Sequence, residues 1–227
     1  MLQGNQSEQL FTALAEQFKL PLLQIARLAE NNSQDNLLAI TTLSNQALRL
    51  IDGFIRVQSQ DQTSLQLEPL TTNSVLYDVA NTLQPLARSY DVLIDVDHQG
   101  KNTPVMAHRE SLQAILTLLG ASLIEASNDE SGAPASIILG THSSAKGVVV
   151  GAFSKHTVLT QRMLLMAREL HGRATQSTPY LGGAGGAGLA IADYLSNQME
   201  APIKSYRHRS MTGLGSLLTP TRQLQLV

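Results

Sequence analysis

The stretch Phe11-Thr-Ala-Leu-Ala-Glu16-Gln-Phe-Lys-Leu-Pro21-Leu-Leu-Gln-Ile25 decides the fold that this sequence predicts. Its apolar residues recur in steps of three, four, seven and three positions, which is typical of one helix of a bundle. They are Phe11, Leu14, Phe18, Ile25 and Leu28. Pro21 has no backbone N–H to donate, so we expect a helix over residues 6–31 that is kinked in its middle.

A second helix is predicted over residues 36–59, with a seam of the same kind. Its apolar members are Ile40, Leu43, Ala47, Leu50, Phe54 and Val57. We expect the two helices to pair as an antiparallel hairpin across the polar turn at residues 31–35. A second copy of the hairpin would bury the exposed stripe in a four-helix bundle, which predicts a homodimer. A hairpin folded back on the rest of the same chain is the alternative.

Composition excludes several classes of protein. The 227 residues are 43% hydrophobic, carry a net charge of -2 and include no cysteine, which excludes disulfides and thiolate metal sites. The sequence has no long apolar run and no N-terminal signal pattern, so we expect a cytoplasmic protein without a membrane segment. The basic residues at 204–209 lack interleaved aromatic residues, so nucleic acid is not an expected partner.

A polar stretch at residues 58–66 predicts a domain boundary, with one domain over residues 1–62 and another over residues 63–227. In the second domain, periodicity predicts helices and strands in alternation. One helix begins near residue 72, and the others span 109–126, 157–170 and 188–199. The strands span 92–97, 103–106, 135–141, 147–153, 203–206 and 214–218. The residues expected to face inward are Leu112, Ile115, Leu116, Leu119 and Leu123 in the helix over 109–126, and Leu189, Ala192, Leu195 and Met199 in the helix over 188–199. This order favours an α+β sandwich with helices on one face of a mixed sheet.

The first helix resembles the phosphoacceptor box of bacterial sensor histidine kinases. That box has a Phe five residues before the acceptor His and a Pro five residues after it, and here these are Phe11 and Pro21. Ala15, Lys19, Leu22 and Ile25 fit the same spacing. Glu16 occupies the acceptor position and Gln17 that of an acidic neighbour, and no histidine precedes His98. The element order after residue 63 resembles the ATPase domain of the histidine kinase, gyrase and Hsp90 group, so the resemblance covers nearly the whole chain.

The resemblance implies ATP and magnesium as ligands, but two of its three nucleotide boxes are altered. On the helix over residues 109–126, Ser122 stands at the position of a magnesium-binding Asn and Glu125 at that of a Lys. A serine hydroxyl is a shorter and weaker neutral ligand than an amide oxygen. Ala152 stands at the position of the Asp that binds adenine, and losing such a bond costs about 1.5 to 3 kcal/mol.

The third box is retained at residues 182–188, where glycines lead into a helix whose first amides are suited to phosphates. The nucleotide-binding candidates are therefore Gly183, Gly185, Gly186 and Gly188, together with Ser122. A flexible lid, or a close contact between a helix and the sheet, is an equally good explanation of the glycines.

The six histidines show no i, i+4 spacing typical of metal ligands, and most fall in predicted turns. We therefore interpret them as structural residues and expect no metal site. His108 directly precedes the helix over residues 109–126, which indicates a helix-start role rather than acid–base chemistry.

These features predict a dimeric pseudokinase or adaptor of two-component signalling that docks a response regulator or a partner kinase. Glu16 is a poor acceptor, because an acyl phosphate forms uphill and hydrolyses readily. A divergent active kinase that holds ATP through its glycine loop is the alternative, and a structural dimer without a ligand is a third. Deliberate replacement of a native histidine would also explain Glu16, although the losses at Ser122 and Ala152 favour natural divergence.

Overall fold

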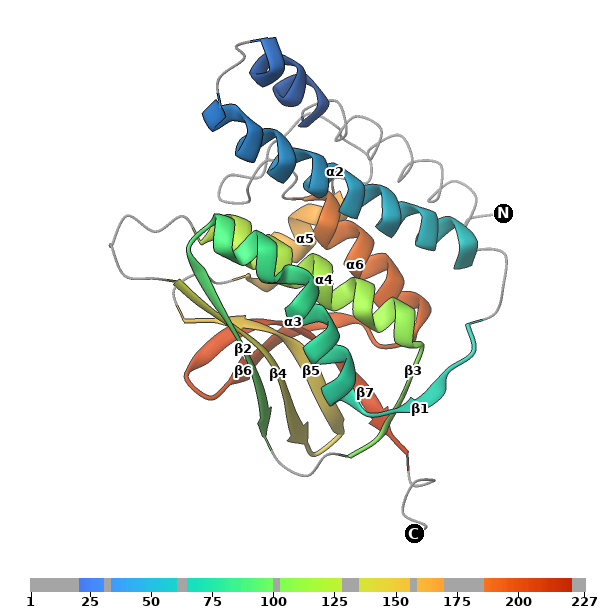
Figure 1. Ribbon diagram of the computed structural model, residues 1–227. Helices are drawn as coiled ribbons and strands as arrows, with labels where there is room; N and C mark the ends of the chain where they lie inside the picture. Colours follow the sequence, from blue (N-terminus) through green and yellow to red (C-terminus); the bar gives the residue numbers. More distant parts are fainter. Residues whose placement is uncertain are drawn as a thin grey trace.

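A computed structural model describes residues 21–30, 34–60, 65–99, 103–127, 135–155, 159–169 and 186–221. A helix at residues 21–30 is followed by helices α2 to α6 and strands β1 to β7 (Figure 1). The helices are α2 (Gln34–Gln60), α3 (Thr72–Ser89), α4 (Arg109–Ala126), α5 (Gln161–Glu169) and α6 (Ala187–Gln198). The strands are β1 (Glu68–Leu70), β2 (Val92–Gln99), β3 (Val105–Ala107), β4 (Ala135–Ser144), β5 (Gly147–Ser154), β6 (Ile203–His208) and β7 (Met211–Pro220).

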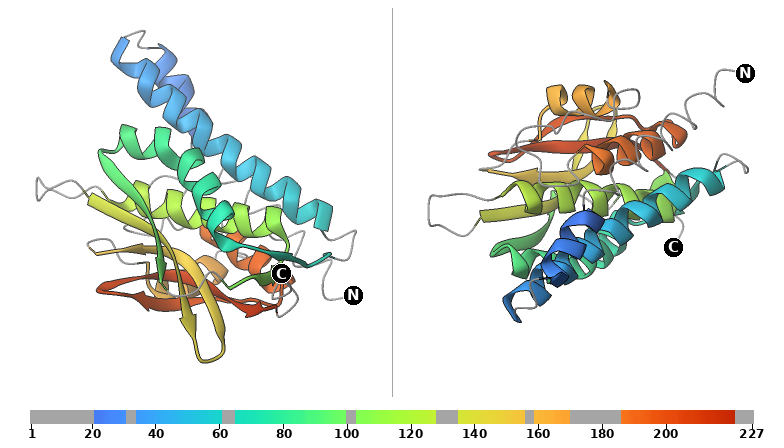
Figure 2. Two further views of the ribbon diagram at one scale, coloured as in Figure 1. Left: turned by 60° about the horizontal axis from the view of Figure 1, so that its bottom comes forward. Right: turned by 90° about the horizontal axis from the view of Figure 1, so that it is seen from above.

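The strands form one mixed sheet, and the helices cover one of its faces (Figures 1 and 2). The order across the sheet is β1-β3-β7-β5-β4-β2, and β6 pairs with β7 off this path. β2 and β4 run parallel, while the other pairs are antiparallel. The predicted α+β sandwich with helices on one face of a mixed sheet is therefore confirmed.

Alternating side chains on the central strands divide the interior in two. Leu139 on β4 and Val150 on β5 point into the main core beneath the helices. Their neighbours Ile138 and Phe153 are also buried but lie outside that core cluster. Because side chains alternate between the faces of a strand, these two residues belong to the outer face of the sheet. The outer face therefore has a small buried cluster of its own.

The predicted element boundaries hold where periodicity is strong. Helix α4 spans the predicted residues, and its expected stripe is fully buried: Leu112, Ile115, Leu116, Leu119 and Leu123. Helix α5 is shorter than predicted, since it begins at Gln161 rather than at residue 157. Strand β1 was not predicted, and β4, β6 and β7 extend beyond their predicted ends. Strand β1 has three residues, which are too few for an alternating pattern to show.

Helix α2 confirms the second predicted helix, but half of its apolar seam packs within the same chain and not against a second copy. Leu50 and Val57 belong to the main core, and Phe54 packs against it. A Cβ atom added to Gly53 would lie 3.0 Å from Cγ2 of Ile191, so α2 approaches α6 closely. This half of the seam is therefore buried within one chain, as in the folded-back alternative, and is not available to a second copy. The predicted boundary at residue 62 lies outside the described residues.

A different face of α2 is left uncovered. It carries four large apolar side chains that are between 38% and 62% exposed: Leu37, Leu48, Ile51 and Ile55. The last three are spaced by three and four positions and so lie on one stripe, which we call the outer stripe of α2. The pattern predicted one seam on this helix, and the structure shows apolar residues on two faces.

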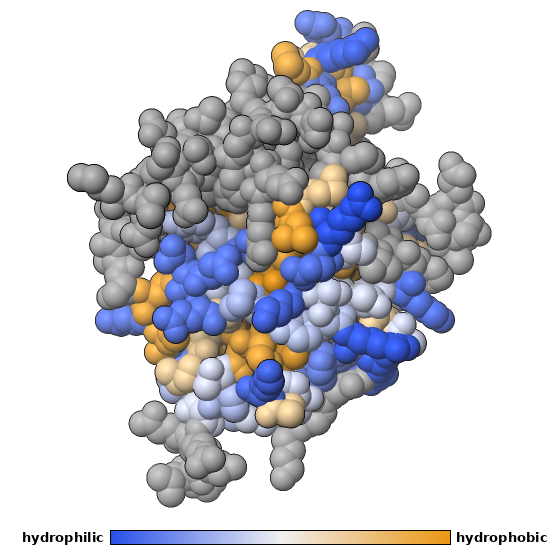
Figure 3. Space-filling view, turned by 180° about the vertical axis from the view of Figure 1, so that it is seen from behind, coloured by the Kyte–Doolittle hydropathy of each residue, from blue (hydrophilic) through white to orange (hydrophobic). Residues whose placement is uncertain are grey.

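Seen from behind the view of Figure 1, the coloured surface is mostly polar, with apolar side chains in separate patches (Figure 3). No helix within the described residues is both long and apolar enough to cross a membrane.

Candidate functional site

Two of the candidate nucleotide residues, Ser122 and Gly188, lie on the neighbouring helices α4 and α6. Ser122 on α4 is 6% exposed, and its hydroxyl donates to the carbonyl of Leu118 in the same helix at 2.8 Å. A Cβ atom added to Gly188 would lie 3.5 Å from Oγ of Ser122. The helices therefore leave room for about a methyl group at this point. The structure thus brings Ser122 and Gly188 close together, with about a methyl group of space between them and with the hydroxyl already bonded within α4.

Ala152 faces the same helical layer from β5. It is fully buried and belongs to the main core. A carboxylate at this position would point into the layer that holds α4, but alanine offers no acceptor. The position predicted for an adenine-binding acid is thus occupied by a core methyl group.

The retained glycine box is only partly within the described residues. Gly186 precedes the first residue of α6, and Gly188 lies in its first turn. Gly183 and Gly185 lie outside the described residues, as do Glu16 and Gln17, so their assigned roles stay predictions. The predicted helix after the glycine box is confirmed, and its expected inward residues are buried: Leu189, Ala192, Leu195 and Met199.

Glu125, one turn after Ser122, joins α4 to α2. Its carboxylate accepts hydrogen bonds from Nη2 of Arg49 and from Nε2 of Gln46, both at 2.9 Å. The side chains of Arg49 and Glu125 are 19% and 6% exposed, so this is a buried ion pair. Burial raises the pKa of Glu125, while Arg49 and Gln46 act in the opposite direction. Glu125 stands at the position of a Lys in the ATPase domain that the sequence resembles, and here it holds α2 against α4.

A second charged pair joins the other end of α4 to α2. Nη1 of Arg56 lies 2.8 Å from Oε2 of Glu110, and the two side chains are 38% and 67% exposed. Such an exposed pair contributes about 1 kcal/mol or less. Of these two links, the buried pair is the one expected to fix the position of α2.

His108 confirms the helix-start interpretation. It is the N-cap of α4, where its Nδ1 accepts from the backbone N–H of Ser111 at 3.3 Å. This bond satisfies one of the amides that every helix leaves free at its N-terminus.

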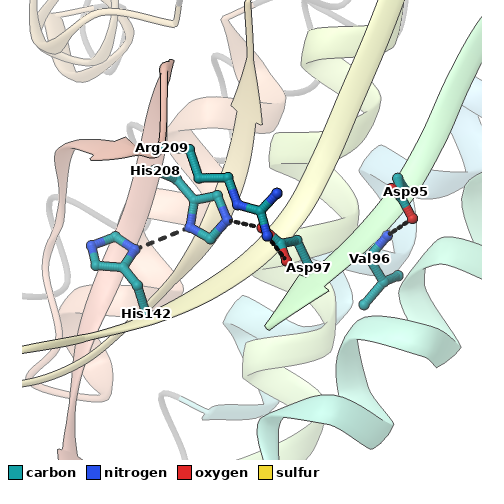
Figure 4. Close-up of polar contacts among 6 residues, drawn as sticks. All are labelled: Asp95, Val96, Asp97, His142, His208 and Arg209. Carbon is teal, nitrogen blue, oxygen red and sulfur yellow. Dashed lines mark hydrogen bonds and ion pairs between the residues drawn. The ribbon is translucent and has the colours of Figure 1, made fainter. Parts of the chain in front are cut away.

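A polar cluster on the outer face of the sheet was missed by our reading of the sequence (Figure 4). His208 at the end of β6 is fully buried, and its Nε2 lies 2.8 Å from Oδ2 of Asp97 on β2. Arg209 donates to the other oxygen of Asp97 at 2.8 Å. His142 on β4 places its Nδ1 3.2 Å from Nδ1 of His208. The expectation that most histidines lie in turns is wrong here, because His98, His142 and His208 all lie in strands.

Close packing holds the ring of His208 in place. Phe153 stacks on it with ring centroids 4.9 Å apart. A Cβ atom added to Gly140 would lie 2.9 Å from Cε1 of His208, so the ring lies directly over the backbone of β4. The sequence signal that could have found the cluster is the alternation of β4 and β6, which places Gly140, His142, Tyr206 and His208 on one face once the strands are correctly extended.

Comparison with known proteins supports the fold and goes no further. No protein-family model matches the chain, and no curated protein matches it. The histidine kinase AdeS of Acinetobacter baumannii matches with a TM-score of 0.58 and 12% identity, over 90% of this chain and 96% of that one. Histidine kinase ThkA, solved in complex with the response regulator TrrA, matches with a TM-score of 0.60 and 15% identity over 95% of this chain and 62% of its own.

Full-length ShkA, solved in complex with AMPPNP, matches with a TM-score of 0.56 and 17% identity over 94% of this chain and 46% of its own. Likeness at such low identity establishes the architecture and leaves activity open. The chain therefore has the fold of a histidine kinase core.

Proposed function

We propose that this chain is a pseudokinase or adaptor of two-component signalling: a homodimer that has lost phosphotransfer and docks a receiver domain or a partner kinase. The fold of a histidine kinase core supports the class of protein. One neighbour of that fold, ThkA, is solved in complex with a response regulator. The replaced acceptor at Glu16 supports the loss of phosphotransfer, because a carboxylate is a poor phosphoryl acceptor from ATP.

The hydroxyl of Ser122, bonded within its own helix close to Gly188, is the observation that carries the proposal. A working nucleotide site needs a free ligand for magnesium and space beside it for the phosphates. Here the hydroxyl of Ser122 is bonded within α4, and the space between it and Gly188 holds about a methyl group. Ala152 adds no carboxylate for the base. Two of the three boxes therefore lack the groups that the reaction needs.

A divergent active kinase is the second candidate, and the start of α6 favours it. The N-cap of α6 is Gly186, which has no side-chain oxygen to bond the first amides of the helix. Such amides can bind phosphate.

Radiolabelled ATP with magnesium distinguishes the two candidates. For the pseudokinase we expect no label on the protein and no rise in melting temperature with ATP or ADP. A ligand present at 100 times its dissociation constant would add about 2.7 kcal/mol of stability, which a thermal shift detects easily. Transfer of label to the protein would reject the proposal in favour of the kinase.

Gly188→Ala tests why glycine is present in the first turn of α6. The added Cβ would make ordinary contacts, at 3.5 Å from Ser122 and 3.7 Å from Leu118. Alanine is the better helix former, so we expect a gain of about 0.5 to 1 kcal/mol in the free energy of unfolding, measured by urea denaturation. If glycine were present to let a nucleotide approach, the variant would instead lose a thermal shift that the unaltered protein shows.

The outer stripe of α2 is the surface that we assign to the dimer. Leu48, Ile51 and Ile55 form an apolar ridge along a long helix, and apolar stripes of this kind mark interaction sites. The stripe lies on the helix whose other seam packs against the sandwich, so a second copy can pair with it without disturbing that contact. A two-fold arrangement would bring the two ridges together.

The double variant Ile51→Glu/Ile55→Glu is expected to convert the dimer into a monomer of 24.5 kDa in multi-angle light scattering. Each buried Ile contributes about 1.5 to 3 kcal/mol, so the dissociation constant should rise at least a hundredfold. Leu165→Glu is the control, since Leu165 on α5 is also exposed but lies off the stripe. A monomeric unaltered protein, or a double variant that stays dimeric, would contradict the assignment.

Docking is tested with receiver domains of the same organism in biolayer interferometry. We expect at least one receiver or kinase to bind, and Glu16→His to change that binding, because the charge at position 16 then changes sign or vanishes. A protein that binds no receiver domain or kinase would reject docking, and partner binding that Glu16→His leaves unchanged would reject the role of position 16; neither result bears on the fold.

A further inference from the structure

Within the part of the chain that the structure describes, three strands of the sheet pair with one neighbour each. They are β1, which pairs with β3, β2, which pairs with β4, and β6, which pairs with β7. The other side of such a strand is an edge, where a row of backbone N–H and C=O groups can bond to a strand of another chain. Each of the three edges carries an obstacle to that pairing.

The edges of β1 and β6 are blocked by proline and by neighbouring helices. β1 has three residues, and its middle residue, Pro69, has no N–H to donate. On β6, the backbone N–H of Ile203 donates to Oγ of Ser196 at 3.2 Å. The N–H of Ser205 donates to Oε1 of Gln161 at 3.1 Å. Amides two residues apart point to the same edge of a strand, so α5 and α6 supply acceptors for the free edge of β6.

β2 is the longest and most apolar of the three edge strands. It has eight residues, against three in β1 and six in β6. Its first five residues are Val92-Leu-Ile-Asp-Val96, and Asp95 is the one charged residue among them. Leu93 is 61% exposed. Short apolar segments of high β propensity and low charge are the ones that pair between copies of a protein. This edge therefore needs protection most.

The side chain of Asp95 occupies the free edge of this segment. Its Oδ1 accepts a hydrogen bond from the backbone N–H of Val96 at 2.8 Å. Figure 4 shows this bond on the side of β2 away from β4, which is the unpaired side. The next carboxylate along the strand, Asp97, points over the sheet and is bonded to His208 and Arg209. Asp95 is thus the side chain that caps an edge amide of β2.

We propose that the hydrogen bond from Val96 to Asp95 prevents β2 from pairing with β2 of a second copy of this chain. Two identical edge strands can pair antiparallel about a two-fold axis. Such pairing needs the N–H of Val96 to bond to a carbonyl of the other copy, and the carboxylate of Asp95 already holds that N–H. The inference uses neither the nucleotide boxes nor the outer stripe of α2, so it does not rest on the proposed function.

Asp95→Ala tests the proposal in the full chain. The N–H of Val96 is then free, so we expect the mass in multi-angle light scattering to at least double relative to the unaltered protein at the same concentration. Asp95→Asn is the matched control, because its amide oxygen can still accept from Val96 although the charge is lost. We expect Asp95→Asn to keep the mass of the unaltered protein. An unchanged mass of Asp95→Ala would overturn the proposal, and association of both variants would show that charge, and not the hydrogen bond, is the barrier.

Amide hydrogen exchange locates the contact. The N–H groups of Ile94 and His98 point to the same edge as that of Val96. In the associated Asp95→Ala variant, we expect them to exchange about tenfold slower or more than in the unaltered protein. Circular dichroism checks that the variant is folded. Association of a folded variant without this protection would place the contact elsewhere and refute the assignment to β2.

Discussion

Replacing Arg49 with methionine is expected to lower the free energy of unfolding by about 3 to 5 kcal/mol at neutral pH. The change removes the cation from a buried pair and leaves the carboxylate of Glu125, 6% exposed, with the hydrogen bond from Gln46. A buried charge without its counter-charge is costly because the interior solvates it poorly. Urea denaturation at pH 7 measures the effect.

The same variant should have a distinctive pH dependence. Burial raises the pKa of Glu125 above its ordinary value of 4.5, so the native state binds this proton more tightly than the unfolded chain does. The stabilising contribution of this group is therefore complete below about pH 4.5 and is lost as pH rises through the folded-state pKa. Without Arg49 that pKa rises further. The stability difference between the two proteins should thus be small near pH 4.5 and grow toward pH 7.

Arg56→Met is the matched control for Arg49→Met, because it removes the same cation from the exposed pair with Glu110. We expect a loss of about 1 kcal/mol or less. Equal losses in the two variants would show that burial does not govern the contact between α2 and α4.

Gly213→Ala is expected to destabilise the protein by about 3 kcal/mol or more. A Cβ atom at this position would lie 2.0 Å from the carbonyl oxygen of Ala152 and 2.8 Å from Cα of Phe153. Both are backbone atoms of the paired strand β5, so no side chain can rotate to make room. The strands would have to separate at the Phe153–Gly213 pair.

Guanidinium denaturation followed by circular dichroism measures this loss. Gly188→Ala provides the control, since the same added methyl meets only ordinary contacts in α6. If both substitutions were tolerated, the close approach of β5 and β7 at Gly213 would not be a requirement of the fold.

The helices of the sandwich could be predicted from sequence because their apolar faces are strongly periodic and are buried between the sheet and the neighbouring helices. Helix α4 is the clearest case, with every residue of its predicted stripe buried. The small space between Ser122 and Gly188 was not predictable in the same way. Sequence identifies the positions, but whether two helices touch or stand apart there depends on packing across the whole layer.

Helix α2 and the outer-face cluster show where periodicity is insufficient. The seam of α2 was correctly identified as apolar, but apolar spacing does not say which partner buries it. Asp97 and His208 are 111 residues apart and meet only because β6 lies off the sheet path beside β7. Spacing within one element cannot reveal a cluster assembled from three strands.

The position of β7 has a consequence for how the protein is made. This strand is the last element of the described chain, yet it lies between β3 and β5 in the middle of the sheet. During synthesis at the ribosome, β3 and β5 remain without their shared neighbour until residues 211–220 emerge. A nascent chain stalled before residue 211 would therefore be a target for chaperones, and translation speed at these residues should influence the yield of native protein.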